Sequence, residues 1–102
     1  MAISQATLGT GATTIFTSSG SNATTAMFFM NDNVSARTLN VHVVPSGGTA
    51  GTTNQIIKAV NIDGGDTYVI NTEKLVLGNG DTIQASASAG SSIYATVSHV
   101  SI

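Results

Sequence analysis

The stretch RTLNVHVVP at residues 37–45 decides the fold class of this chain. Apolar residues at positions 39, 41 and 43 alternate with polar residues at positions 38, 40 and 42, the period-two pattern of a strand with one buried face. Pro45 then ends the strand, because proline cannot donate a hydrogen bond to a sheet. We therefore predict a half-buried strand over residues 37–44.

Before and after this strand, turn-forming residues recur along the chain at regular intervals. The segments between them have the composition of short strands. We expect strands at residues 13–18, 24–31, 37–44, 55–62, 67–70, 74–77, 81–87 and 93–102. Asn79-Gly80 predicts a tight hairpin between the strands at 74–77 and 81–87. Seven or eight short strands without a helical segment indicate a β-sandwich or a barrel, and we expect an antiparallel β-sandwich, either jelly-roll or Ig-like.

The composition supports an all-β domain with an unusually uncharged surface. Thr, Ser, Gly and Asn supply 46 of the 102 residues, and only 8% are charged, with a net charge of −2. Ordinary soluble domains carry about a quarter charged residues. At this length we expect one sandwich domain at residues 13–102, preceded by an extended N-terminal arm at residues 1–12.

The same numbers exclude several classes of partner. Three Lys and Arg residues cannot neutralise a run of phosphates, so neither nucleic acid nor an anionic membrane surface is an expected partner. The longest apolar run, residues 26–30, is far shorter than the roughly 20 residues of a membrane span. The first residues lack the pattern of a secretory signal. The absence of cysteine rules out disulfides and thiolate sites.

Few residues could carry chemistry. His42 lies at an outward position of its strand, and His99 adjoins Ser98, which must point to the opposite sheet face and so cannot form a nucleophile–base pair with it. Most carboxylates fall in or beside turns, where they hydrogen-bond the backbone; residues 63–66 could offer oxygen ligands to Ca²⁺ but do not match the usual loop. We expect no catalytic residue, no cofactor and no metal ion.

Candidate contact residues come from strands that break the alternation of apolar and polar side chains. Met27-Phe28-Phe29-Met30 places large apolar groups on both faces, as expected either for a central strand covered by a loop or for an oligomer or docking face. The pattern repeats near Ile57, and at the end of the chain a bulge near Ser98 would restore the alternation. The predicted partner contacts are Phe28, Met30, Ile57 and the 46–54 loop with Ser46, Gly47, Gly48, Thr49 and Asn54.

Three segments carry a resemblance to a known class of protein. They are AISQATLG at residues 2–9, LNVHVVPSGG at residues 39–48 and LVLGNGDTIQA at residues 75–85. The chain resembles small all-β structural proteins of tailed bacteriophages, notably those of aquatic and cyanobacterial phages. The resemblance specifies no catalytic residue. It implies a role as a capsid decoration (cement) protein, or as a component of tails, necks, baseplates or fibres.

The expected function is therefore that of a non-enzymatic virion structural protein, assembled in the host cytoplasm. Its partners would be the major capsid protein or other virion subunits, and the chain itself is expected to form a homo-oligomer. A capsid decoration protein that stabilises contacts between capsomers is the leading hypothesis, and a tail, neck or baseplate component is the nearest alternative. A carbohydrate-binding or adhesin module is the alternative from another class, because β-sandwiches host such sites.

Overall fold

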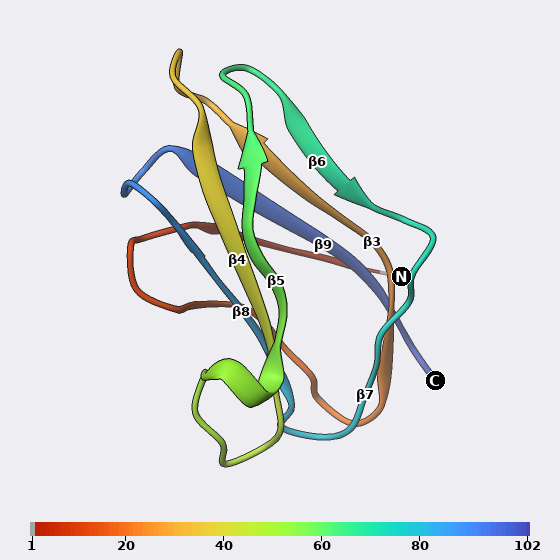
Figure 1. Cartoon of the computed structure of the whole chain (residues 1–102). Coiled ribbons are helices and arrows are strands. Elements are labelled where there is room, and N and C mark those ends of the chain that lie inside the picture. Colours follow the sequence, from red (N-terminus) through yellow and green to blue (C-terminus); the bar gives the residue numbers. More distant parts are fainter. Residues whose placement is uncertain (1) are drawn as a thin grey trace.

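A computed structural model describes residues 2–102 as two antiparallel β-sheets packed face to face (Figure 1). The strands are β1 (Ala2–Thr7), β2 (Thr13–Thr17), β3 (Asn22–Asn31), β4 (Arg37–Val44), β5 (Gln55–Ile62), β6 (Thr67–Ile70), β7 (Val76–Leu77), β8 (Thr82–Ala87) and β9 (Ile93–Ser101), with one short 3-10 helix, η1 (Thr52–Asn54). The all-β sandwich expected from the sequence is confirmed, with nine strands in the described range instead of seven or eight.

The order of the strands identifies the type of sandwich. One sheet runs β1-β9-β3-β6, with β7 also pairing with β3, and the other runs β2-β8-β4-β5. The pairs are nested, because β4 pairs with β5, β3 with β6, β2 with β8 and β1 with β9. A long antiparallel ribbon rolled over on itself gives this nesting, which is the jelly-roll arrangement and not the Ig-like one.

The core lies between the two sheets and is built from the inward side chains of the central strands. Phe29, Leu39 and Ile83 are completely buried, with an exposed fraction of 0%. Each comes from a different strand, and together β3, β4 and β8 supply apolar groups from both sheets. Burial of such side chains contributes about 1.5–3 kcal/mol each, which is the main stabilising term in a chain without disulfides.

A bulge in β3 determines which of its side chains enter this core. Thr24 is opposite His99 and Ala26 is opposite Ser98, so Thr25 is an extra residue on β3. The expected bulge near Ser98 is therefore present, but the extra residue belongs to the partner strand β3 and not to β9. Because the bulge shifts the alternation by one residue, Thr24 is inward before it and Met27 is inward after it.

The N-terminal segment differs from the arm expected at residues 1–12. Residues 2–7 form β1, an integral strand that pairs with β9 from Ala2 opposite His99 to Thr7 opposite Tyr94. Ser4 Oγ also donates a hydrogen bond to the Ile15 carbonyl of β2 at 2.8 Å and so links the two sheets at this edge. No local pattern in the sequence indicates this pairing, because the strand that pairs with β1 lies almost the whole chain length away.

The predicted hairpin at Asn79-Gly80 is also corrected. β7 pairs with residues 22–23 of β3, whereas β8 belongs to the other sheet, so residues 78–81 cross between sheets instead of joining paired strands. Gly80 has the expected positive φ, +86°, but Asn79 does not, so the turn is not the two-residue hairpin turn that Asn-Gly predicts. The Asp81 carboxylate accepts hydrogen bonds from the backbone N–H groups of Ser46 and Gly78, both at 2.9 Å, and thereby fixes the crossing.

Candidate functional site

The two outer faces of the sandwich differ in chemistry. On the β2-β8-β4-β5 sheet, amide and hydroxyl groups hydrogen-bond one another: Gln55 Nε2 donates to Asn40 Oδ1 at 3.1 Å, and Asn40 Nδ2 donates to Ser86 Oγ at 3.4 Å. Next to them, Gln84 Nε2 donates to Thr82 Oγ1 at 3.1 Å. This face is polar and much of its hydrogen-bonding capacity is already used within the chain.

The outer face of the other sheet carries an apolar cluster, here called the outer patch, which consists of Phe28, Met30, Val69 and Tyr94. Their exposed fractions are 40%, 37%, 42% and 37%. The register brings them together, because Phe28 is opposite Val69 of β6 and Met30 is opposite Tyr94 of β9. Phe29 points the other way and is fully buried, so the strand places large apolar groups on both faces, as the sequence indicated.

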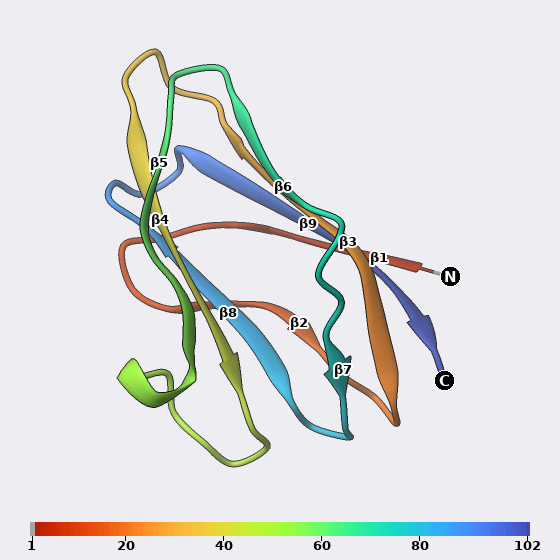
Figure 2. The same cartoon turned by 45° about the vertical axis from the view of Figure 1, so that its right-hand side comes forward.

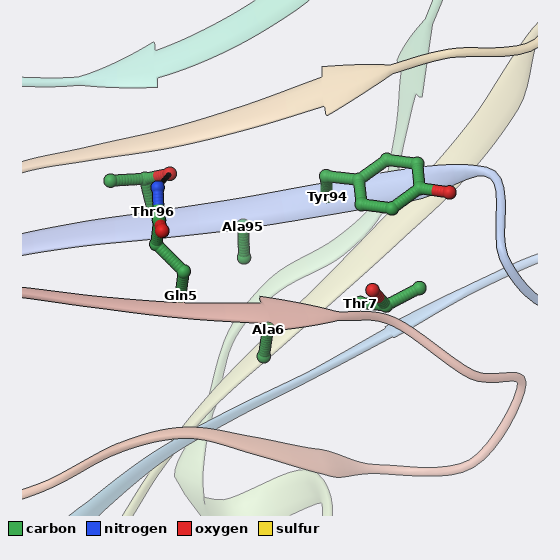
Figure 3. Close-up of a pocket in the computed structure, with 6 residues that line it drawn as sticks. All are labelled: Gln5, Ala6, Thr7, Tyr94, Ala95 and Thr96. Atoms are coloured by element: carbon green, nitrogen blue, oxygen red, sulfur yellow. Dashed lines mark hydrogen bonds between the residues drawn. The ribbon is translucent and has the colours of Figure 1, made fainter.

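A depression adjoins the outer patch where β1 and β9 lie side by side (Figure 3). It has a volume of about 300 Å³. Its lining residues are Gln5, Ala6, Thr7, Tyr94, Ala95 and Thr96. Gln5 Nε2 donates to Thr96 Oγ1 at 3.3 Å, which leaves the amide oxygen of Gln5 and the Tyr94 phenol beside the depression for other contacts. The lining can stack and hydrogen-bond, but it offers no carboxylate, imidazole or amine for acid–base chemistry.

Asp, Glu, Lys and Arg residues are absent from all five strands of this sheet. All eight lie between positions 32 and 81, outside β1, β3 and β9, and β6 and β7 within that range carry none either. At the border of the sheet, Lys74 Nζ donates to the Thr25 carbonyl at 2.7 Å and also to the Asn71 carbonyl. A partner that covers the outer patch would therefore remove few charges from water, and the desolvation cost of docking there is low.

The structure separates the contact residues expected from the sequence. Phe28 and Met30 belong to the outer patch, whereas the 46–54 loop joins β4 to β5 in the opposite sheet. That loop folds on itself: Asn54 Nδ2 donates to the Thr49 carbonyl at 2.9 Å, and Gly48 N donates to the Pro45 carbonyl at 2.8 Å. The loop and the outer patch are thus two distinct surfaces.

Ile57 occupies a third position. It is half-buried and packs against the core, while its neighbour Ile56 is 49% exposed. Both residues line a groove of about 360 Å³ at the open side of the sandwich between β5 and β6. The other lining residues are Tyr68, Ile70, Glu73, Lys74 and Leu75. Ile57 therefore contributes mainly to the chain's own packing, and Ile56 is the more accessible of the pair.

Two members of the outer patch, Val69 and Tyr94, were not among the residues predicted from the sequence. Tyr94 lies one position from the inward Ile93 and Ala95, so the alternation along β9 contained the signal for its outward direction. The sequence contained no such signal for the direction of Val69. The short strand β6 has apolar side chains on both of its faces, so its sequence does not show which face is outward. Its place in the patch depends on its pairing with β3.

The histidines do not form a catalytic arrangement with the serine beside them. The His99 ring packs on Phe16, with 4.2 Å between the ring centroids, whereas Ser98 accepts a hydrogen bond from Thr25 Oγ1 on the outer side. The expected opposite placement of Ser98 and His99 is confirmed. His42 faces outward as expected, and its Nδ1 is buried without a hydrogen-bond partner in residues 2–102. In that same range, no group of three or more His, Cys, Asp or Glu residues could hold a metal ion.

Comparison of the chain with protein-family models, with curated proteins and with solved structures finds no match. Across the described residues, there is no helix with the length and apolar character needed to cross a membrane. The features of the molecule that bear on its function are the outer patch with its adjoining depression and the uncharged strands around them.

Proposed function

We propose that this chain is a non-enzymatic structural protein of a bacteriophage particle, and specifically a capsid decoration protein that binds the outside of the capsid. The observation that supports this proposal is the outer patch of Phe28, Met30, Val69 and Tyr94 on an uncharged sheet face. Contiguous exposed apolar groups on a small domain are typical of protein-binding surfaces. The resemblance of residues 2–9, 39–48 and 75–85 to phage structural proteins gives the class of partner.

The outer patch suits a permanent contact with another protein subunit. Its side chains project from the paired strands β3, β6 and β9, so docking would cost little additional ordering of the backbone. Covering the exposed portions of these four residues removes apolar area from water at about 25 cal/mol per Å². The hydroxyl and amide groups of Thr96 and Gln5 lie at the border and can form hydrogen bonds with the partner.

The test is co-sedimentation of the purified protein with expanded capsids of the encoding phage that lack it. We expect the natural protein to bind and Val69→Asp to bind at least about tenfold more weakly, because a charge would be buried in the contact. Val34→Asp is the matched control, since Val34 is 97% exposed in a loop outside the patch. Failure of the natural protein to bind, or equal loss with both variants, would contradict the proposal.

Two further measurements separate decoration from the alternatives in phage assembly. Virions that lack the protein should lose resistance to heat and to dilution, because capsomer contacts would no longer be stabilised. A cryo-EM map should place the chain on the capsid in hundreds of copies. Its presence in small multiples of three or six would instead assign it to the tail, neck or baseplate. The Thr49→Asp variant tests independently whether the exposed 46–54 loop is a second contact region.

A carbohydrate-binding module is the second candidate, and the depression beside Tyr94 is the observation that favours it. An exposed aromatic ring next to the Gln5 amide and the Thr7 and Thr96 hydroxyls can stack on a sugar and hydrogen-bond its hydroxyl groups. A glycan array with the natural protein and Tyr94→Ala decides the question. Binding that Tyr94→Ala abolishes would support this candidate, and an array without binding would remove it.

A further inference from the structure

Strand β1 forms an open edge of its sheet. It pairs with β9 on one side along its whole length, from residue 2 to residue 7, without a register shift (Figure 2). The phase of the hydrogen bonds follows from Leu8, whose N–H donates to the Ile93 carbonyl at 2.9 Å. The backbone N–H and carbonyl groups of successive residues in an antiparallel strand point to opposite edges of the strand, so residues 2, 4 and 6 bond to β9. The backbone groups of Ile3, Gln5 and Thr7 point away from it.

The other edge strands carry features that block further pairing, and β1 carries none of them. β5 contains Lys58 and a bulge with Ala59 at a φ of +54°. β2 has a bulge at Ile15, and β6 is only four residues long. Charges, bulges and short length are the means by which natural edge strands avoid pairing with other chains. β1 is regular, six residues long and free of charge and proline.

We propose that β1 pairs edge to edge with β1 of a second copy of this chain, antiparallel about a twofold axis at Gln5. In this register Gln5 faces Gln5 of the second copy, and Ile3 faces Thr7 of the second copy. The three free N–H groups and three free carbonyl groups of each edge then bond to one another. The two sheets join into one continuous sheet, and the outer patches lie on the same face of it.

The occupant is a second copy because the edge is complementary to itself. An antiparallel twofold pairing presents the same donors and acceptors from both chains, as an isologous interface requires. There is no charged residue before Asp32, so two copies can approach along β1 without repulsion between like charges. Ile3, which is 63% exposed, would be covered by Thr7 of the second copy. This inference is independent of the proposed phage function.

The decisive experiment measures self-association by sedimentation velocity over a range of protein concentrations. We expect a dimer for the natural protein. Gln5→Glu and Gln5→Lys should each raise the dissociation constant about tenfold or more, because like charges would face each other across the axis. A one-to-one mixture of the two variants should restore the dimer. Gln84→Glu and Gln84→Lys, on the outer face of the other sheet, are the matched controls.

A second variant tests the register directly. The chain has no cysteine, so Gln5→Cys introduces a single thiol. Opposed residues of a hydrogen-bonded antiparallel pair have Cα atoms about 5.5 Å apart, within the range of a disulfide. Oxidation should convert Gln5→Cys, but not Gln84→Cys, to a covalent dimer. A natural protein that stays monomeric at the highest concentration, or a dimer that the charged Gln5 variants leave unchanged, would overturn the inference.

Discussion

Thr25 Oγ1 donates a hydrogen bond to Ser98 Oγ at 2.7 Å, across the bulge that determines which residues of β3 face the core. If Thr25 occupied an ordinary place in the β3–β9 pairing, without the bulge, the alternation that buries Thr24 would continue into the second half of β3 and turn Phe28 inward. With the bulge, Met27 becomes buried and Phe28 is left on the outer face. The outer patch is thus a consequence of the bulge at Thr25, and the hydrogen bond to β9 stabilises that bulge.

The first prediction concerns this hydrogen bond. A double-mutant cycle of Thr25→Ala and Ser98→Ala should give a coupling free energy of about 0.5–1.5 kcal/mol in urea unfolding, the range for a neutral hydrogen bond between partly buried groups. The exposed pair of Gln5 and Thr96, with 3.3 Å between donor and acceptor, should give a smaller coupling. Equal couplings in the two cycles would show that the bulge does not depend on the contact.

The second prediction compares two adjacent phenylalanines. Phe29→Ala should lower the free energy of unfolding by about 3–5 kcal/mol, because the ring is fully buried and its removal leaves a cavity in the core. Phe28→Ala should cost far less, because 40% of that side chain is exposed. Urea unfolding of the two variants measures the difference. Similar losses for both would contradict the difference in burial, and a larger loss for Phe28→Ala would mean that the β3 alternation is the reverse of the one described.

Much of the fold was predictable because it depends on local sequence. The strands at residues 37–44, 55–62 and 67–70 have the bounds expected from their alternation and from the turn residues that flank them. The outward position of His42 followed from the same alternation. These features need only the period of two and the chemistry of Pro, Gly, Asn and Asp, all of which a single stretch of sequence contains.

The errors have a common physical cause, which is pairing between distant segments. β1 was expected as an arm because its partner β9 lies at the other end of the chain. β7 was expected to pair with β8, but it fills the edge of β3 below β6. Two adjacent phenylalanines do not indicate which of them faces the core, because the bulge at Thr25 determines this. The outer patch was therefore half predictable: Phe28 and Met30 were named, and Val69 and Tyr94 required the register.

The third prediction concerns Asn31, a completely buried polar residue at the end of β3. Its Nδ2 donates to the Ile62 carbonyl at 2.9 Å and to the Ser35 carbonyl at 3.0 Å, and its Oδ1 accepts from Asn33 N at 2.9 Å. Asn31→Ala removes all three bonds and leaves the Ile62 carbonyl without this donor in a site with little access to water. We expect a loss of about 2–4 kcal/mol in the free energy of unfolding.

The matched control for Asn31 is Asn71→Ala. Asn71 is exposed and its side chain makes no hydrogen bond within residues 2–102, so its replacement should change the free energy of unfolding by less than about 0.5 kcal/mol. Both variants are compared by urea unfolding under the same conditions. A loss for Asn31→Ala no greater than that for Asn71→Ala would show that the three hydrogen bonds make no net contribution to stability.

The fourth prediction tests the close contact between the turn after β5 and the turn after β3. A Cβ atom at Gly64 would lie 2.3 Å from the Val34 carbonyl oxygen and 2.8 Å from that of Asn33. Both are backbone atoms and cannot rotate away, so Gly64→Ala should lower the free energy of unfolding by about 1–3 kcal/mol. Gly11→Ala is the control, because its Cβ would meet no atom within 4 Å. If thermal unfolding gives the same midpoint for both variants, the two turns do not pack as closely as described.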